Sequence, residues 1–294
     1  MTAAGLLLCL LASPAASELE APPFTVIFTP PYRAEAERIA AEIPAIVERQ
    51  TRALGSPPLA PAELHLLPES GRDDPGREGI PSWAAGVALP HEHRILIWPD
   101  RIGRYTQRHL LSVVAHETAH LVAHRAAGMG AHHMPPWFRE GVASNLAREG
   151  EWLDFFYLWA SPISSSDRPL EELSGSFGSE DPMALTRAAY AGSYSFVRFI
   201  EERHSPDLPA SVLAGLREGL GFETAYARAA GVTLRHDEAE WAATMRGRSR
   251  WVAIVTSSFT LWLTITLLAT LAWLRKRRRT RMTMERWTEE DPFE

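Results

Sequence analysis

The 294-residue chain contains a single cysteine, Cys9, which lies close to the N-terminus. An intrachain disulfide bond is therefore excluded, and so are a catalytic thiol and a cysteine metal ligand in the body of the chain. Positive charge is also sparse: the formal net charge is −6, and Lys276 is the only lysine. No basic face precedes residues 275–294, so nucleic acid is not expected as a partner.

An uncharged apolar run lies at each end of the chain. Residues 1–17 combine the run LLLCLL with small residues, which is typical of a signal peptide cleaved after Ser17. Residues 251–274 carry no charge and, as a helix, are long enough to cross a bilayer. The basic sequence RKRRRTR follows directly, and the positive-inside rule then predicts a cytoplasmic tail over residues 275–294.

These end segments predict where the protein works. Residues 18–250 form the expected body, which is long enough for one globular domain. We expect this body outside the cytoplasm, in the periplasm if the organism is a Gram-negative bacterium, and held at the membrane by a single C-terminal helix.

Hydrophobic periodicity predicts strands before about position 100 and mainly helices after it. Strands are expected at Phe24–Thr29, 62–68, Val87–Leu89 and Arg94–Trp98, and a helix between the first two ends near Gly55. The predicted fold class is α+β. It consists of a small mixed β-sheet packed on one long helix, a mostly helical second half and one C-terminal transmembrane helix.

That long helix contains the sequence LLSVVAHETAHLVAHRAAG and within it the pattern H-E-x-x-H. His116 and His120 are four residues apart, so a helix places both imidazoles on one face, where they can bind one Zn²⁺. Glu117 stands beside the first histidine and is long enough to reach a zinc-bound water. The pattern is short and also occurs in ordinary buried helices, so the interpretation depends on a third ligand.

A catalytic zinc requires a third protein ligand and keeps a fourth position open. His124 would lie about 12 Å along the helix axis from His116, too far to share one ion, so we expect a polar or packed helix residue there. Glu140, in PPWFREGVA, lies twenty residues after His120 on a second predicted helix and is the favoured third ligand. The alternative is a solvated carboxylate near a helix start.

HETAH followed by PPWFREGVA resembles the gluzincins, zinc peptidases of the MA clan. The resemblance is greatest to bacterial peptidase-MA-like families related to aminopeptidase N and thermolysin, and it covers roughly residues 87–195. It implies that His116, His120 and Glu140 bind one zinc ion. It also implies that Glu117 is the catalytic general base.

The same resemblance extends to the substrate side of the site. In aminopeptidase-N-like enzymes a tyrosine opens a Y-x-x-G-x-x-φ-φ stretch and stabilises the oxyanion. Tyr190 matches that position, with Ser193 in place of the glycine; Tyr194 is the alternative, and both could also be half-buried helix tyrosines. The segment GVALP resembles the edge strand that holds the substrate backbone, which implies that role for residues 86–88.

Four further histidines are assigned to no site. His91 and His93 alternate in a predicted turn and have no partner cluster in the sequence. His132 and His133 belong to the loop before the second helix, where they could touch substrate, although exposure to solvent is favoured.

These features predict a membrane-anchored, extracytoplasmic zinc peptidase that hydrolyses peptide bonds in a peptide or protein substrate through a zinc-activated water. Endopeptidase action is favoured over aminopeptidase action, because no motif marks a site for a free substrate amine. Two alternatives stay open. One is a catalytically silent binding or regulatory protein on a peptidase-like scaffold, and the other is a transmembrane signalling protein that acts through its basic tail.

Overall fold

The structure is a computed structural model that describes residues 16–69, 80, 83–102, 110–147, 170–175, 183–255 and 258–289. The chain divides into two compact units, Met1–Ala242 and Ala243–Glu294. All the strands described, together with the residues of the predicted metal site, belong to the first unit. The domain boundary predicted at residue 250 stays a prediction.

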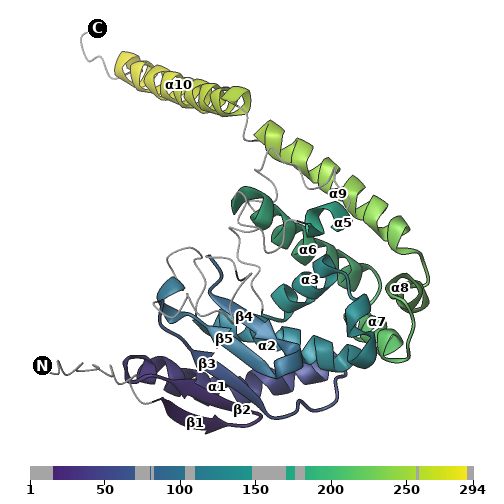
Figure 1. The fold of residues 1–294 in the computed structure, drawn as a ribbon. Helices are drawn as coiled ribbons and strands as arrows, with labels where there is room; N and C mark the ends of the chain where they lie inside the picture. The colour runs from purple at the N-terminus through teal and green to yellow at the C-terminus, as the bar shows by residue number, and fades with distance from the viewer. Residues whose placement is uncertain are drawn as a thin grey trace, which may run out of the picture. The chain divides into compact units, whose positions relative to one another are not determined.

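A five-stranded sheet of order β1-β2-β3-β5-β4 forms the N-terminal part of the first unit (Figure 1). β1 (Ser17–Ala21) pairs antiparallel with β2 (Phe24–Phe28), and β3 (Ala62–Leu66) pairs parallel with β2. β5 (Arg94–Ile97) continues the parallel pairing. β4 (Gly86–Leu89) closes the sheet antiparallel to β5, and among the described residues its other edge is open.

Two helices lie side by side against this sheet (Figure 1). α1 (Arg33–Ala53) connects β2 to β3, and its buried residues Ile39, Ile43 and Val47 recur at helical spacing. They pack against the alternating buried residues of β2. α2 (Leu110–Ala127) contacts α1, β4 and β5, so the H-E-x-x-H motif lies next to the edge strand.

The rest of the first unit is helical, and an aromatic core joins its elements. α3 (Pro136–Leu146) packs along α6 (Met183–Arg203), and α7 (Leu208–Arg217) packs against α8 (Phe222–Ala230) and α2. The first unit also contains η6 (Gly128–His133), α5 (Leu170–Ser174) and the first part of α9 (Leu234–Val255), which continues past the unit boundary at Ala242. Edge-to-face ring contacts link Trp137, Phe138, Phe196, Phe222 and Trp241.

The predicted α+β class is wrong in two respects. The share of helix is larger than this class implies, and the described residues contain no membrane-spanning helix. The described chain is mostly helical with a small mixed sheet, because its strands have four or five residues whereas its helices have up to 32. The predicted small sheet against the long helix of the motif is present, but it is the minor part of the fold.

Within the described residues, no helix has both the length and the apolar character needed to cross a membrane. This finding overturns the transmembrane helix predicted at residues 251–274, and with it the membrane partner and the single-pass topology with a cytoplasmic tail. The uncharged run does not form a helix of its own. α9 ends at Val255, and α10 (Ser258–Glu289) begins within the run and continues through the basic RKRRRTR sequence.

The predicted signal peptide lies outside the described residues except at its end. Residues 16 and 17 are described, and Ser17 already belongs to β1, where it pairs with Phe28. The predicted cleavage after Ser17 would therefore remove the first residue of this strand.

Candidate metal centre

The two motif histidines project from one face of α2, one turn apart. Their ring centroids are 4.8 Å apart and the ring planes stand at 85° to each other. Both side chains are largely buried, with His116 at 5% and His120 at 11% exposure. Because α2 is enclosed by the sheet, α3 and α7, it presents polar side chains to the interior of the unit.

Glu140 reaches the same point from α3. Its Oε2 lies 3.4 Å from Nε2 of His116 and 3.5 Å from Nε2 of His120. One ligand atom from each of the three residues lies within 4.8 Å of the other two. α3 begins at Pro136, directly after Pro135, and only the short η6 segment separates it from α2. The second turn of α3 therefore brings the Glu140 carboxylate back to α2.

The electrostatics of the cluster suit a cation. Burial alone would raise the pKa of Glu140, but the charge on His120 and hydrogen bonds with His116 and His120 hold that pKa well below its usual range. Arg139 approaches the other carboxylate oxygen, Oε1, at 3.4 Å. Two imidazoles and one carboxylate are a ligand set that fits Zn²⁺ and leaves one position open.

Glu117 is also buried, at 8% exposure, and lies against the edge strand. A Cβ atom placed on Gly86 would lie 2.8 Å from Cγ and 2.9 Å from Oε1 of Glu117, and 2.9 Å from a methyl carbon of Val113. Such distances are too short for a real Cβ atom, so glycine at position 86 makes room for the Glu117 side chain.

Tyr190 flanks the cluster from α6. Its ring centroid lies 6.4 Å from that of His116, with the planes tilted by 55°, and 6.4 Å from that of Trp83 in an edge-to-face contact. Tyr194 is one turn further along α6, and its carbonyl oxygen accepts a hydrogen bond from Nδ2 of Asn145 at 3.1 Å. The structure thus brings Tyr190 next to a residue of the metal cluster.

Two supporting residues were not found from the sequence. Gln50 of α1 is fully buried and donates from Nε2 to the carbonyl oxygen of Ala115, 2.7 Å away and directly before His116. Gly141 follows Glu140, and a Cβ there would lie 2.5 Å from the carbonyl oxygen of Ser193 in α6. Gln50 could have been noticed in the sequence as a polar residue on the apolar stripe of α1. No feature of the sequence indicates the contact between α3 and α6 at Gly141.

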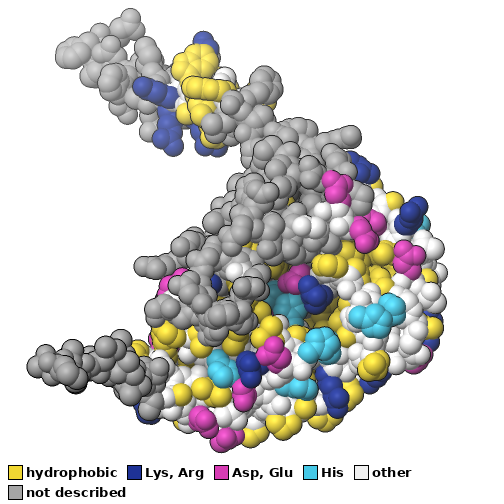
Figure 2. Space-filling view, viewed as in Figure 1, with side chains coloured by type: hydrophobic (Ala, Val, Ile, Leu, Met, Phe, Trp, Pro, Cys, Tyr) yellow, Lys and Arg dark blue, Asp and Glu magenta, His cyan; other side chains and the backbone are white. Residues whose placement is uncertain are grey.

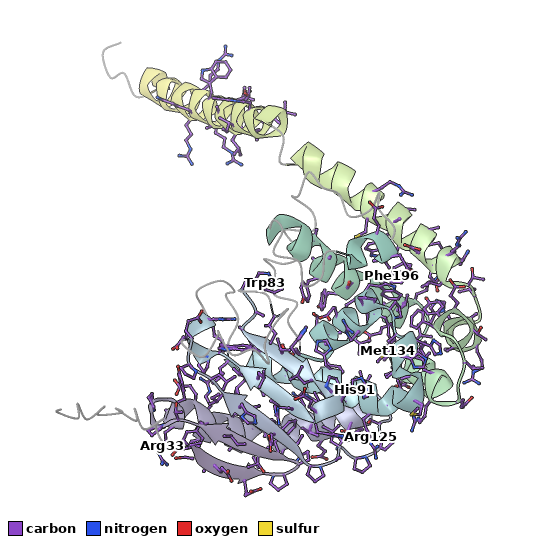
Figure 3. The ribbon with its side chains drawn as sticks, viewed as in Figure 1. Arg33, Trp83, His91, Arg125, Met134 and Phe196 are labelled. Carbon is purple, nitrogen blue, oxygen red and sulfur yellow. The ribbon has the colours of Figure 1, made fainter. Side chains whose placement is uncertain are left out.

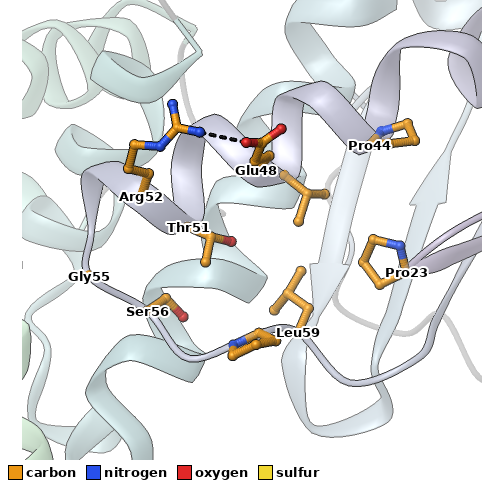
Figure 4. A pocket seen from close by; sticks show the side chains of 10 residues that line it. Pro23, Pro44, Glu48, Thr51, Arg52, Gly55, Ser56 and Leu59 are labelled. Atoms are coloured by element: carbon orange, nitrogen blue, oxygen red, sulfur yellow. Dashed lines mark hydrogen bonds and ion pairs between the residues drawn. The ribbon is translucent and has the colours of Figure 1, made fainter.

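Two other features of the first unit lie apart from this cluster. A hollow of about 700 Å³ opens between the end of α1, Pro23 and the segment 55–59, and it shares no lining residue with the metal cluster (Figure 4). A second group of possible metal ligands consists of His236, Asp237 and Glu240. In this group Asp237 already accepts hydrogen bonds from Tyr226 at 2.6 Å and His204 at 2.8 Å. In the space-filling view, histidine side chains lie in and around a hollow on the face shown (Figure 2).

Comparison with protein families shows that the chain is peptidase-like. A family model described as Peptidase MA superfamily matches residues 78–247, which is more than half of the chain. The chain belongs to the peptidase MA superfamily, which confirms the resemblance to this clan. The match includes the edge strand, the metal cluster and Tyr190. Comparison with curated proteins gives no match.

Proposed function

We propose that the protein is a zinc-dependent peptidase of the gluzincin type, related to aminopeptidase N and thermolysin. His116, His120 and Glu140 would bind one Zn²⁺, and Glu117 would be the general base. The observation that carries this proposal is the convergence of the three ligand atoms, from two helices, within 4.8 Å of one another. The burial of all three side chains supports a site that holds its metal firmly.

Zinc, when bound, supplies a Lewis acid that activates water and polarises the substrate carbonyl. The Glu117 carboxylate accepts the proton of the attacking water and passes it to the leaving amine. The Glu117 side chain is buried against Gly86 of β4, which limits the positions that its carboxylate oxygens can adopt. The position of this carboxylate is therefore set by packing before substrate arrives.

Tyr190 is the proposed donor to the oxyanion that forms when the carbonyl is attacked. Its ring beside His116 supports this role, since the reacting carbonyl must lie next to the metal ligands. Donors of this kind lower the barrier by about 2.7–4 kcal/mol.

The substrate is proposed to be a peptide or protein that binds along β4. This strand pairs with β5 on one side, and within the described residues its other edge is open. An extended peptide can add to such an edge through backbone hydrogen bonds, which supports a holding role for residues 86–88. No feature marks a site for a free amine, so we propose endopeptidase action.

The direct test is Glu117→Gln in the full chain, which keeps the size of the side chain and removes the base. We expect tightly bound zinc at the Glu140 cluster in both proteins and loss of peptide cleavage in the variant. Glu223→Gln, at an exposed position in α8, is the matched control and should cleave normally.

Cleavage that survives in Glu117→Gln would remove Glu117 from its proposed role. A wild-type chain that carries zinc but cleaves nothing in broad peptide libraries, and does not bind hydroxamate inhibitors, would instead favour a silent binding protein on this scaffold.

A further inference from the structure

A second pair of histidines meets beside the far end of α2. His91 lies in η4 (Pro90–Glu92), the turn that follows the edge strand, and is labelled in Figure 3. His124 lies in the last turn of α2. Their ring centroids are 4.8 Å apart and the planes stand at 84°. The pair His116 and His120 has the same separation and an angle of 85°.

These two rings have free nitrogen atoms. In the described part of the chain neither side chain makes a hydrogen bond or an ion pair, and their mutual contact is the interaction that engages them. His91 is exposed and His124 is half-buried, so solvent reaches the pair. Two imidazoles from separate elements, without other bonds and at the ring separation of the pair His116 and His120, are candidates for metal ligands.

The imidazole of His93 also acts electrostatically on His124, and no carboxylate offsets that effect. Burial, followed by the charges on His91 and His93, lowers the pKa of His124, which favours the neutral, metal-binding form of its ring. Glu92, the nearest acid in the turn, is engaged by Arg94 at 2.9 Å. Protonated histidines would therefore repel one another here, whereas one bound cation would hold the neutral rings together.

We propose that His91 and His124 form a second metal site, specific for a divalent transition ion such as Zn²⁺ and completed by water. Imidazole ligands favour zinc, copper and nickel over magnesium and calcium. With two protein ligands and open access, the site binds its ion more weakly and exchanges it faster than the buried cluster at Glu140. His124 follows His120 by one helical turn, about 6 Å along the axis, so the two sites are separate neighbours.

The second site also has a mechanical role. Its ion would tie the turn after β4 to the end of α2, and so fix the edge strand against the helix that carries Glu117. Zinc binding should therefore raise the melting temperature of a chain in which the buried cluster is disabled.

The test is a zinc titration by calorimetry, with the full chain and with the double variant His120→Ala, Glu140→Ala, which leaves one ligand in the buried cluster. Wild type should bind two zinc ions, one tightly and one weakly. The double variant should retain the weak ion and show the rise in melting temperature. Adding His91→Ala or His124→Ala to the double variant should weaken the remaining ion at least about tenfold, since even an outer partner of a metal ligand is worth about 10–100-fold.

The matched control is His132→Ala with His133→Ala, a neighbouring pair whose centroids are 3.9 Å apart at 41°. This change should leave the weak ion in place. The proposal is overturned if the double variant binds no zinc, if the His91→Ala change has no effect, or if the control abolishes binding instead. His91 is exposed, so its variant keeps the test decisive even if His124→Ala misfolds. Because the double variant has a single ligand left in the buried cluster, this result is independent of the peptidase proposal.

Discussion

Gly86 of the edge strand touches the side chain of Glu117 in the neighbouring helix, with room for a hydrogen atom and not for a methyl group. This contact couples the strand proposed to hold substrate to the residue proposed to activate water. Packing at one position of β4 thus sets the position of the carboxylate.

We predict that Gly86→Ala lowers kcat/KM by about a hundredfold, because displacing a catalytic group by about 1 Å costs that much. Zinc content should stay unchanged, since the three atoms nearest to a Cβ at this position belong to Glu117 and Val113 and not to a proposed metal ligand. Peptide cleavage and zinc analysis measure the two effects. Gly221→Ala, where a Cβ would meet no atom within 4 Å, is the matched control. Equal activity in both variants would contradict the prediction.

Tyr190 and Tyr194 are distinguished by removing one hydroxyl at a time. Tyr190→Phe should lower kcat by about 10²–10³-fold with little change in KM, because the lost donor acts in the transition state. Tyr194→Phe should be close to wild type. Steady-state kinetics on one peptide measure both, and the reverse ranking would transfer the role to Tyr194.

Glu201 in α6 gives the protein a pH-dependent stability. Burial raises its pKa from 4.5 to about 7, with Arg198 opposing and Glu202 adding to the shift. The folded chain therefore favours the protonated carboxyl, whose stabilising contribution is full below 4.5 and is lost as the pH rises through about 7.

Replacing this carboxyl by a neutral amide, Glu201→Gln, should therefore stabilise the fold at about pH 8.5 and change it little at about pH 4.5. Urea unfolding at both pH values measures the difference in unfolding free energy. Glu223→Gln is the exposed control. A variant that shifts stability equally at both pH values would show that the effect is not the ionisation of Glu201.

Asp237 joins three helices from a fully buried position. It accepts hydrogen bonds from Tyr226 in α8 and His204 after α6, and it lies 3.2 Å from Arg203. Asp237→Asn keeps the shape but removes the charge, and should cost about 1.5–3 kcal/mol of unfolding free energy. Denaturant unfolding measures this cost. Asp207→Asn, exposed and without a side-chain capping bond, should change stability little.

The sequence predicted the elements whose signal is local. β2 begins at Phe24 as expected, and β4 and β5 match the two predicted strands around the turn to within one residue, because each has a short apolar run. β1 was missed because four of its five residues are not buried and give no hydrophobic signal. The apolar run 251–274 was misjudged because its length suggested one helix, whereas the structure divides it between two.

The proximity of His116, His120 and Glu140 could be predicted because helical spacing and one short connection bring them together, whereas their binding of a metal stays a proposal. Contacts between segments that are distant in the sequence could not be predicted. Gly86 and Glu117 are 31 positions apart, and nothing in either segment specifies their contact. His91 seemed to lack a partner because its partner, His124, is 33 positions away and meets it through the packing of β4 on α2.

The close approach of α3 to α6 at Gly141 has a consequence for the proposed site. Because α3 packs directly on the backbone of α6, this contact fixes the position of Glu140 relative to Tyr190. A larger residue at position 141 would therefore displace a proposed metal ligand and the proposed oxyanion donor relative to each other.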